Sequence, residues 1–332
     1  MIDSSEIAVI IQGAFDKLIT PQAIASVRQY LPKAEIILST WQGTALPEDL
    51  KVEKIILNED PGFCFYSNIK GDKKNNVNRQ IVSTCQGLKT TQRKYALKMR
   101  TDFILTGNNF LNYFDKYKKV NPKYQLFEKK LIACSFFARV PEESKTPLHI
   151  SDLLFFGLTK DILKLFDIPL MPKQDEYCYK RGKFLHTRYV PEQYIFCACL
   201  NKYKMPFKMV NSRDINEDNI EQTHNYFANN FVFLSYSQYS VLPSAMLADI
   251  SINYRDCYTL VKWKKIYKQY VDSDFVITEK EDPIQKQLIK MRKYYGLLKT
   301  LFSIIILPKI RRKYRKAVSR KIFIVMIKKG LV

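Results

Sequence analysis

The sequence predicts an α/β fold, with a mixed, mostly parallel sheet flanked by helices. Short apolar runs in the first hundred residues each stop at polar residues, as buried parallel strands do. Between these runs lie segments with apolar residues three and four apart, the spacing of a helix that buries one face. With 332 residues and 46% hydrophobic content, the chain is long enough to bury a large core.

The first hundred residues alternate between the two patterns, which predicts a βαβ series. Thr20 and Pro21 resemble an N-cap followed by a proline at the first helical position, and Pro32 ends that helix. The predicted strands are 7–11, 35–40, 54–57 and 95–100, and the predicted helices are about 20–30 and 78–89.

The second half of the chain is less regular. Strands are predicted over 131–137, 153–156, 208–210 and 231–234, and a helix from Pro191 to about Tyr203. From residue 284 the pattern is helical as far as Pro308. No internal repeat or Gly/Ser-rich linker interrupts the chain. We therefore expect one catalytic domain over residues 1–283, followed by a basic, amphipathic extension over 284–332.

The charge is concentrated in that extension. The chain carries a net charge of +22, and residues 286–332 contain 15 Lys or Arg and no Asp or Glu. Its apolar runs, within 296–308 and 322–327, are shorter than the roughly 20 residues that span a bilayer. Apolar runs bracketed by basic residues favour an anionic membrane surface as partner. A helix packed on the core with a solvated basic face is the alternative.

The remaining composition bounds the class of protein. The basic residues are not spread over the body with aromatic platforms, so no nucleic acid is expected as a partner. The N-terminus lacks the pattern of a signal peptide, and the seven cysteines are scattered, as in a reduced environment. We therefore expect a cytoplasmic protein, peripheral on the inner face of the cytoplasmic membrane.

Polar residues follow the predicted strands at the point where each strand ends. Ligands of open α/β sheets bind beyond the carboxyl ends of the strands, so these side chains should lie on one rim. They are Gln12, Gly13, Thr40, Glu59, Asp60, Arg100 and Asp102.

A cluster of amides and an arginine opens the helix predicted near residue 78. It contains Asn75, Asn76, Asn78 and Arg79. A helix N-terminus presents free N–H groups to an anion, and an arginine can grip a phosphate with two hydrogen bonds. These four residues are therefore candidates for binding the phosphates of a nucleotide donor substrate. The alternative is that one asparagine caps the helix and Arg79 is solvated.

The strand that ends at Arg100 carries the next candidates. An Asp just past a buried strand end is a typical ligand of a hard divalent cation, so Asp102 is a candidate metal ligand for Mn²⁺ or Mg²⁺. Lys98 and Arg100 add positive charge for a diphosphate, and strand alternation places both on one face with Asp102. The alternative is an internal Arg100–Asp102 pair that closes the strand.

Two further carboxylates are candidate general bases. Asp152 precedes an apolar run, and Glu192 follows Pro191 at a helix start. Either could take the proton of an acceptor hydroxyl, with Asp102 completing the candidate catalytic set. Asp152 could instead simply begin a strand, and Glu192 could complement the helix dipole.

A family resemblance is carried by seven segments within about 7–235, namely 9–13, 31–41, 58–62, 75–84, 98–102, 150–157 and 191–194. Together they resemble the WavE-type lipopolysaccharide-synthesis family, a group of bacterial surface-polysaccharide glycosyltransferases. The resemblance implies a GT-A-like nucleotide-diphosphosugar transferase fold. It also implies that the first strand end and the Asp60 region cradle the nucleobase and ribose. Asp102 would occupy the place of the second Asp of the metal-binding Asp-x-Asp motif, although Arg100 stands where the first Asp would be.

The resemblance implies a glycosyltransferase of lipopolysaccharide or capsule biosynthesis. The expected donor is a nucleotide sugar, in the first instance a UDP-sugar, and the expected acceptor is a lipid-linked oligosaccharide. A nucleotidyltransferase is one alternative, although only Gly13 stands where a glycine-rich loop would be needed. A non-catalytic membrane-associated adaptor with the same fold is the other.

Overall fold

The computed structural model describes residues 2–67, 73–182, 184–242 and 256–283. A seven-stranded sheet with strand order β12-β8-β9-β6-β1-β2-β3 forms its centre. The strands are β1 (Ile7–Gln12), β2 (Glu35–Trp41), β3 (Lys54–Asn58), β6 (Tyr95–Arg100), β8 (Leu131–Cys134), β9 (Phe155–Leu158) and β12 (Phe231–Leu234). All the pairs are parallel except those of β9, which runs antiparallel to β6 and β8.

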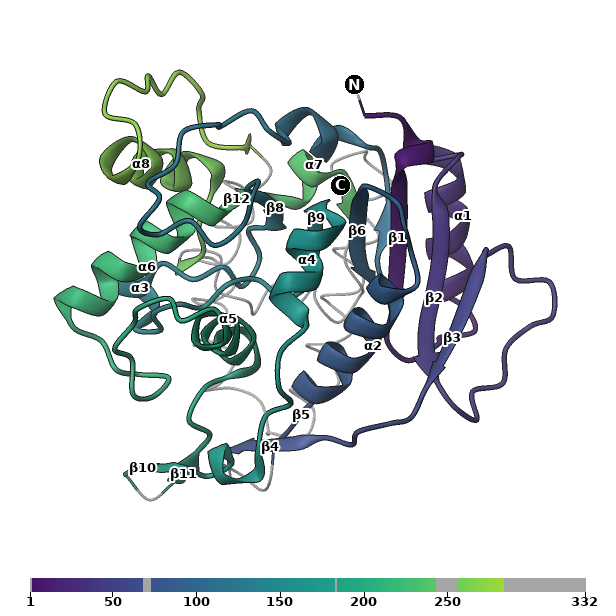
Figure 1. Cartoon of the computed structure of the whole chain (residues 1–332), viewed down its shortest axis with the longest axis horizontal. Coiled ribbons are helices and arrows are strands. Elements are labelled where there is room, and N and C mark those ends of the chain that lie inside the picture. Colours follow the sequence, from purple (N-terminus) through teal and green to yellow (C-terminus); the bar gives the residue numbers. More distant parts are fainter. Residues whose placement is uncertain (1, 68–72, 183, 243–255, 284–332) are drawn as a thin grey trace, which may run out of the picture.

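Helices cover both faces of this sheet. In Figure 1, α2 (Val77–Lys89) and α4 (Thr159–Phe166) lie in front of the sheet and α1 (Thr20–Tyr30) lies behind it. Three other long helices surround the half of the sheet that ends in β12, namely α5 (Pro191–Lys202), α6 (Glu217–Asn230) and α8 (Leu260–Tyr270). The predicted α/β architecture is confirmed.

Strand register brings the polar strand ends to one edge. Every residue of β1 is buried, which explains its unbroken apolar run. Gln12 pairs with Ser39 on β2 and with Arg100 on β6, so β1 and β6 end at the same level, and β2 continues for two more residues to Trp41. Gly13 then turns the chain with φ at 122°, a backbone conformation that favours glycine.

The start of the first helix differs from the prediction. Ile19 is the N-cap of α1 and makes no side-chain capping bond, while Thr20 is already helical. The Thr20 hydroxyl instead accepts a hydrogen bond from the Asp16 amide at 2.9 Å and donates one to the Thr101 carbonyl at 3.3 Å. It thereby fastens α1 to the loop after β6 rather than capping its own helix.

Three strand predictions in the second half need correction. The strand predicted over 131–137 ends at Cys134, because Phe137 has a left-handed φ of 66° that breaks an extended chain. The strand predicted from 153 begins at Phe155, since the Leu153 carbonyl accepts from the Lys98 side chain. Residues 208–210 form a loop, in which Val210 donates its amide to the Asp214 carboxylate. Neither α6 nor α8 was predicted, and each packs on the other.

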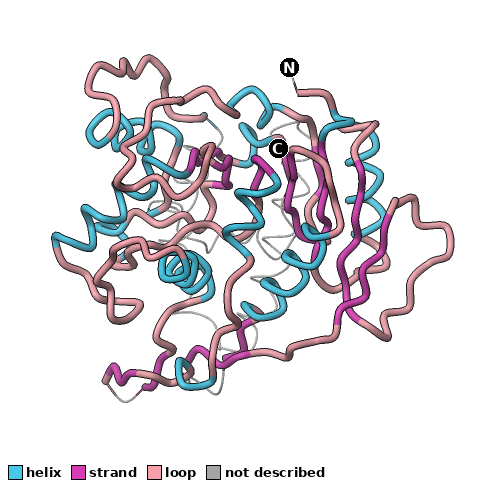
Figure 2. Tube along the Cα trace, viewed as in Figure 1, coloured by secondary structure: helices cyan, strands magenta, loops and turns pink. Residues whose placement is uncertain are grey.

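Two small sheets complete the described elements, and Figure 2 shows the larger of them set apart from the main sheet. It has strand order β10-β11-β4-β5, from β10 (Tyr179–Arg181), β11 (Phe184–His186), β4 (Cys64–Ser67) and β5 (Lys73–Asn75). Because β5 leads within two residues into α2, this small sheet stands beside the start of that helix. The other pairs β7 (Ile104–Leu105) with β13 (Val241–Leu242), and the short helices are α3 (Pro141–Ser144) and α7 (Tyr236–Tyr239).

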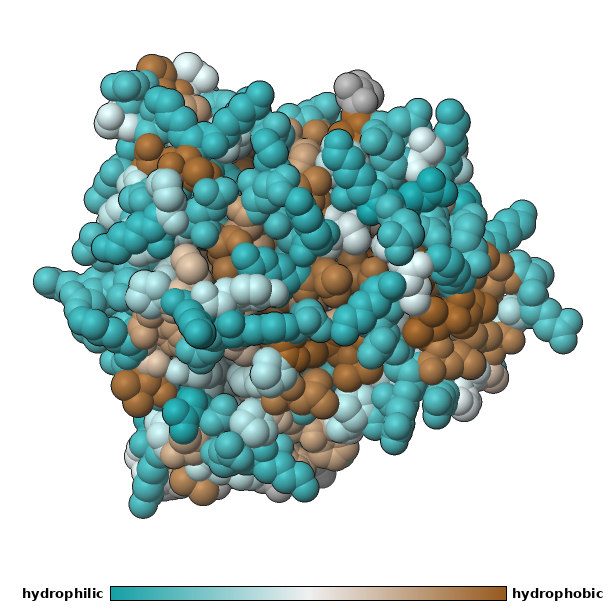
Figure 3. Space-filling view, viewed as in Figure 1, coloured by the Kyte–Doolittle hydropathy of each residue, from teal (hydrophilic) through white to brown (hydrophobic). Residues whose placement is uncertain are grey.

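The face drawn in Figure 3 is mainly hydrophilic, and one of its apolar areas lies at the sheet edge. Ile55 and Leu57 of the edge strand β3 are exposed, and Figure 3 shows hydrophobic surface over that edge. Among the residues that the structure describes, no helix has both the length and the apolar character needed to cross a membrane. The predicted helix from residue 284 and the membrane-associating extension 284–332 lie outside the described residues.

Candidate functional site

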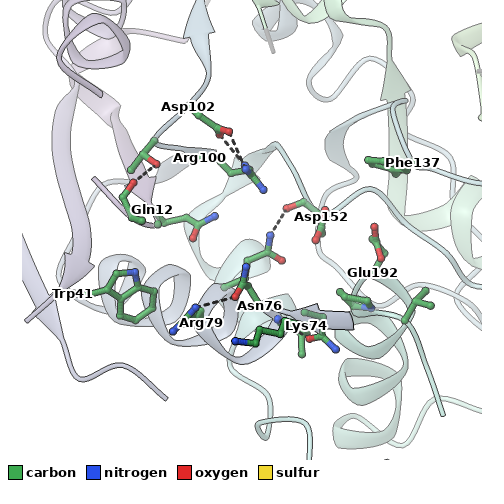
Figure 4. Close-up of a pocket in the computed structure, with 18 of the residues that line it drawn as sticks. Gln12, Trp41, Lys74, Asn76, Arg79, Arg100, Asp102, Phe137, Asp152 and Glu192 are labelled. Atoms are coloured by element: carbon green, nitrogen blue, oxygen red, sulfur yellow. Dashed lines mark hydrogen bonds and ion pairs between the residues drawn. The ribbon is translucent and has the colours of Figure 1, made fainter. Parts of the chain in front are cut away.

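A cavity of about 750 Å³ opens at the carboxyl ends of β1, β2 and β6. Figure 4 shows side chains from the sheet, from the start of α2 and from the loops before β9 and α5 facing this space. Nine predicted site residues line it: Gln12, Gly13, Asn75, Asn76, Arg79, Arg100, Asp102, Asp152 and Glu192. The topology therefore brings most of the predicted rim together with both candidate bases.

Gln12 and Gly13 build the wall at the end of β1. The Gln12 side chain accepts a hydrogen bond from Ser83 of α2 at 2.7 Å, which fastens the strand end to the helix. A Cβ on Gly13 would lie 3.5 Å from the Thr101 hydroxyl, so the turn also runs close against the loop after β6. The Ser83–Gln12 hydrogen bond holds this side of the cavity in place.

Arg79 and Lys74 give the α2 side of the cavity its positive charge. Arg79 donates from Nε and Nη2 to the two oxygens of Asp60, at 2.7 and 2.6 Å, and from Nη1 to Asn76 at 3.0 Å. The guanidinium holds the pKa of Asp60 below its usual value, so this carboxyl stays ionised at neutral pH. The Asn75 side chain accepts from the Val77 amide at 3.1 Å, which is the capping role left open above. Asn76, at the N-cap itself, makes no side-chain capping bond.

Arg100 and Asp102 form the internal pair that the sequence left as an alternative. The two oxygens of Asp102 accept from Nε and Nη2 of Arg100, each at 2.8 Å. Both side chains remain partly exposed in the cavity, at 30% and 19%. A divalent cation at Asp102 would have to displace this arginine, and the described residues contain no group of three His, Cys, Asp or Glu side chains that could hold a metal. The residues around Asp102 therefore do not fit the predicted Mn²⁺ or Mg²⁺.

Lys98 lies beneath the cavity and does not line it, contrary to its predicted donor contact. Its side chain is fully buried and donates to the carbonyls of Asp152 and, at 3.3 Å, Leu153. Burial lowers the pKa of this lysine to about 7. The segment 152–153 covers the face of β6 at the level of Lys98, so only the end of the strand reaches the cavity. Gln80 of α2 also donates to the Asp152 carbonyl, at 3.2 Å.

Three other predicted rim residues, and Asn78 of the helix-start cluster, lie outside the cavity lining. Thr40 is fully buried within β2. Asn78 exchanges hydrogen bonds with the main chain of Met171, at 2.7 and 3.2 Å, because its position in the first turn of α2 faces the neighbouring loop. Asp60 stands behind Arg79, and Glu59 is exposed after β3.

Asp152 faces the cavity from the loop before β9, and Glu192 faces it from the first turn of α5. Burial and then the Asp152 charge raise the pKa of Glu192, while Arg139 acts in the opposite direction. The Glu192 side chain is only 16% exposed, and its Oε2 lies 3.8 Å from Nε2 of His149. Burial, and next Arg139, lower the pKa of His149 to about 3, so this imidazole is neutral near pH 7. Burial and the nearby Asp152 charge therefore favour a Glu192 side chain that keeps its proton near neutral pH.

Several cavity residues were missed by reasoning from the sequence. They are Phe15, Trp41, Lys74, Phe137, Arg139 and His149. Trp41 directly follows a predicted strand and Lys74 directly precedes the asparagine cluster, so their positions in the sequence could have indicated that they lie at the site. No local pattern indicated Arg139, because its place is set by a backbone contact with Cys257, far along the chain.

The comparisons with known proteins give one family. A search of curated proteins found no match. A family model described as WavE lipopolysaccharide synthesis matches residues 7–293, which extends past the segments that carried the resemblance. Because the match covers most of the chain, this protein belongs to the WavE lipopolysaccharide synthesis family.

Proposed function

We propose that this protein is a glycosyltransferase that moves a sugar from a nucleotide-diphosphate donor to a glycan acceptor of lipopolysaccharide synthesis. One observation carries the proposal. A single cavity at the sheet edge holds positively charged side chains on one side and the Asp152–Glu192 carboxyl pair on another (Figure 4). Sugar transfer needs both features, because a diphosphate leaves and a hydroxyl must lose its proton.

The donor diphosphate lies against Lys74, Arg79 and Arg100. Arginine suits phosphate because its planar guanidinium donates two parallel hydrogen bonds. Asp102 occupies Nε and Nη2 of Arg100 and thereby orients the group, leaving Nη1 for a ligand. The first amides of α2 add further donors, because a helix N-terminus favours an anion. These fixed charges stabilise the leaving diphosphate as the bond from the sugar C1 to the phosphate oxygen breaks.

Asp152 is the general base in this proposal. The acceptor hydroxyl gives its proton to the Asp152 carboxylate as its oxygen bonds to C1, and the diphosphate leaves with the bonding electrons of the broken bond. Glu192 keeps its own proton, since burial and the Asp152 charge both raise its pKa. Lys98 and Gln80 hold the Asp152 carbonyl from below, which positions the base.

The acceptor in this proposal is a lipid-linked glycan on the inner face of the cytoplasmic membrane. Two observations support this acceptor: the family is described by lipopolysaccharide synthesis, and residues 286–332 are strongly basic. A protein that binds an anionic surface through such residues is concentrated where its lipid-linked acceptor lies. Capsule synthesis shares this chemistry, but the family description names lipopolysaccharide.

A thermal-shift panel of UDP-, GDP-, ADP- and CMP-sugars tests the proposal, each with Mn²⁺ and with EDTA. A ligand that binds only the folded protein raises its melting temperature. At a ligand concentration of a hundred times Kd, the folded state is stabilised by about 2.7 kcal/mol. At least one nucleotide sugar should do so, and its matching free sugar should not. The Arg79→Gln variant should lose most of the shift. If no nucleotide sugar stabilises the protein, the proposed function is wrong.

A further inference from the structure

Two further arginines, Arg181 and Arg213, lie near Arg139 but outside the residues that line the cavity. Arg139 lines the cavity itself and lies two residues before α3. Arg213, in the loop between α5 and α6, donates from Nη1 to the carbonyl of Ser144, the last residue of α3, at 2.8 Å. Arg139 and Arg213 are therefore neighbours across the short helix α3.

Arg181 reaches the same surface from the small sheet. The hydroxyls of Tyr179 on β10 and Ser212 in the loop lie 2.7 Å apart, which fastens the strand that ends at Arg181 to the loop that carries Arg213. The charges respond to this closeness. Burial lowers the pKa of Arg213, Arg181 lowers it further, and Arg139 contributes in the same direction. The Arg213 guanidinium is thus repelled by two others, those of Arg181 and Arg139.

This repulsion is only partly offset within the described ranges. Arg139 forms an ion pair with Asp256. Arg181 and Arg213 are both exposed, and neither forms an ion pair with a carboxylate of the residues that the structure describes. A cluster of like charges costs free energy unless an anion joins it. The ligand that fits arginine forks is a phosphate or a carboxylate, which each guanidinium can bind through two hydrogen bonds.

Resting on the proposed function, we propose that Arg181 and Arg213, with Arg139 beside them, bind a phosphate or carboxylate group of the acceptor glycan. The position of these arginines favours contact with the acceptor glycan rather than with the nucleotide donor. In Figure 4, Phe137, two residues before Arg139, lies on the Glu192 side, while Arg79 and Lys74 lie across the cavity. The carboxyl pair thus lies between two cationic regions, one for the donor diphosphate and one for an acidic acceptor.

The test is calorimetric titration of the full-length protein with matched sugars, maltose 1-phosphate against maltose and methyl glucuronide against methyl glucoside. We expect the charged member of at least one pair to bind at least about tenfold more tightly than its neutral partner, the effect of one charge-assisted contact. The double variant Arg181→Gln with Arg213→Gln should abolish this preference. The control is Lys33→Gln with Lys160→Gln, which removes two charges from side chains that are 70% and 64% exposed elsewhere, and it should keep the preference.

Several outcomes would overturn the inference. Equal binding within both pairs, or a preference that survives in the Arg181/Arg213 variant, removes the proposed contact. Inorganic phosphate that binds as tightly as maltose 1-phosphate reveals an ion site with no glycan preference. Weaker binding of the variant to phosphatidylglycerol vesicles, with sugar-phosphate binding unchanged, assigns the arginines to a lipid surface instead.

The nucleotide-sugar panel, run on the same double variant, separates this inference from the proposed function. Donor shifts should stay as in the unaltered protein, because Arg79 and Arg100 are untouched. If no nucleotide sugar raises the melting temperature of the unaltered protein, the proposed function is wrong. If nucleotide sugars still raise it but the charged sugars bind no more tightly than the neutral ones, only the acceptor inference is wrong.

Discussion

Arg100 donates to both carboxylate oxygens of Asp102, from Nε and from Nη2, at 2.8 Å each. The pair lies at the end of β6, where the resemblance implied an Asp-x-Asp metal motif. A fixed guanidinium there supplies positive charge without a cation. The same geometry makes Asp102 an orienting partner of Arg100 and leaves it poorly placed as a metal ligand.

The first prediction concerns Arg100. Arg100→Gln should weaken binding of the stabilising nucleotide sugar about tenfold to a hundredfold, because it removes a charge-assisted contact with the diphosphate. Arg100→Lys should recover little of this loss, since an ammonium lacks the planar fork. Titration calorimetry in EDTA measures both. Binding that requires Mn²⁺ in the unaltered protein would contradict the role given to Arg100.

The second prediction concerns Asp60, which competes with phosphate for Arg79. Asp60→Asn keeps an oxygen that can accept from Arg79 but removes the opposing charge. Donor binding should therefore become tighter, by at most about fivefold, since the Asp60–Arg79 pair is solvent-exposed. The gain should shrink with added salt. Weaker donor binding in this variant would mean that Asp60 chiefly positions Arg79.

The third prediction concerns the proton on Glu192. Its pKa is raised in the folded protein to about 8, against an ordinary value of 4.5. Between these two values the unfolded chain has lost the proton that the folded protein keeps, so this group makes stability fall as pH rises. Below about pH 4.5 both states are protonated and the penalty disappears.

Glu192→Gln imitates the protonated form and should therefore be more stable than the unaltered protein at pH 7. At pH 4.5 the difference should be much smaller. Urea unfolding at both pH values measures this directly. Turnover should survive in Glu192→Gln but fall at least about a hundredfold in Asp152→Asn, since only Asp152 acts as base. The reverse order of activities would exchange the two roles.

The fourth prediction concerns Lys98, a positioning residue. Lys98→Met removes the donors to the carbonyls of Asp152 and Leu153, so the base should be misplaced. We expect kcat to fall while KM for the donor changes little, because the diphosphate contacts remain.

Lys130→Met is the matched control for Lys98→Met. Lys130 is also buried, its pKa is also lowered to about 7 by burial, and it donates to the Lys119 carbonyl at 2.8 Å, away from the cavity. Its removal should change stability but leave kcat intact. Equal loss of kcat in both variants would reduce Lys98 to a general role in folding.

The sequence by itself determined the strands and helices that build the rim of the site. The apolar runs of β1, β2 and β6 and the periodicity of α2 are local patterns that reflect burial of their own side chains. The run of β3 is equally local, although Ile55 and Leu57 of this edge strand are exposed. Since parallel strands end at a common edge, the closeness of Gln12 and Arg100 also followed from the chain.

Only the tertiary structure decided which way the charged side chains turn and what they meet. Lys98 and Arg100 lie on the same face of β6, yet Lys98 is covered by the loop before β9 and Arg100 reaches the cavity. Arg79 meets Asp60, and Arg139, Arg181 and Arg213 gather from three separate segments. Such partners are distant in sequence, and no local pattern encodes them. The free energy of burying or pairing a charge depends on the whole fold, so the electrostatics of this site became visible only in three dimensions.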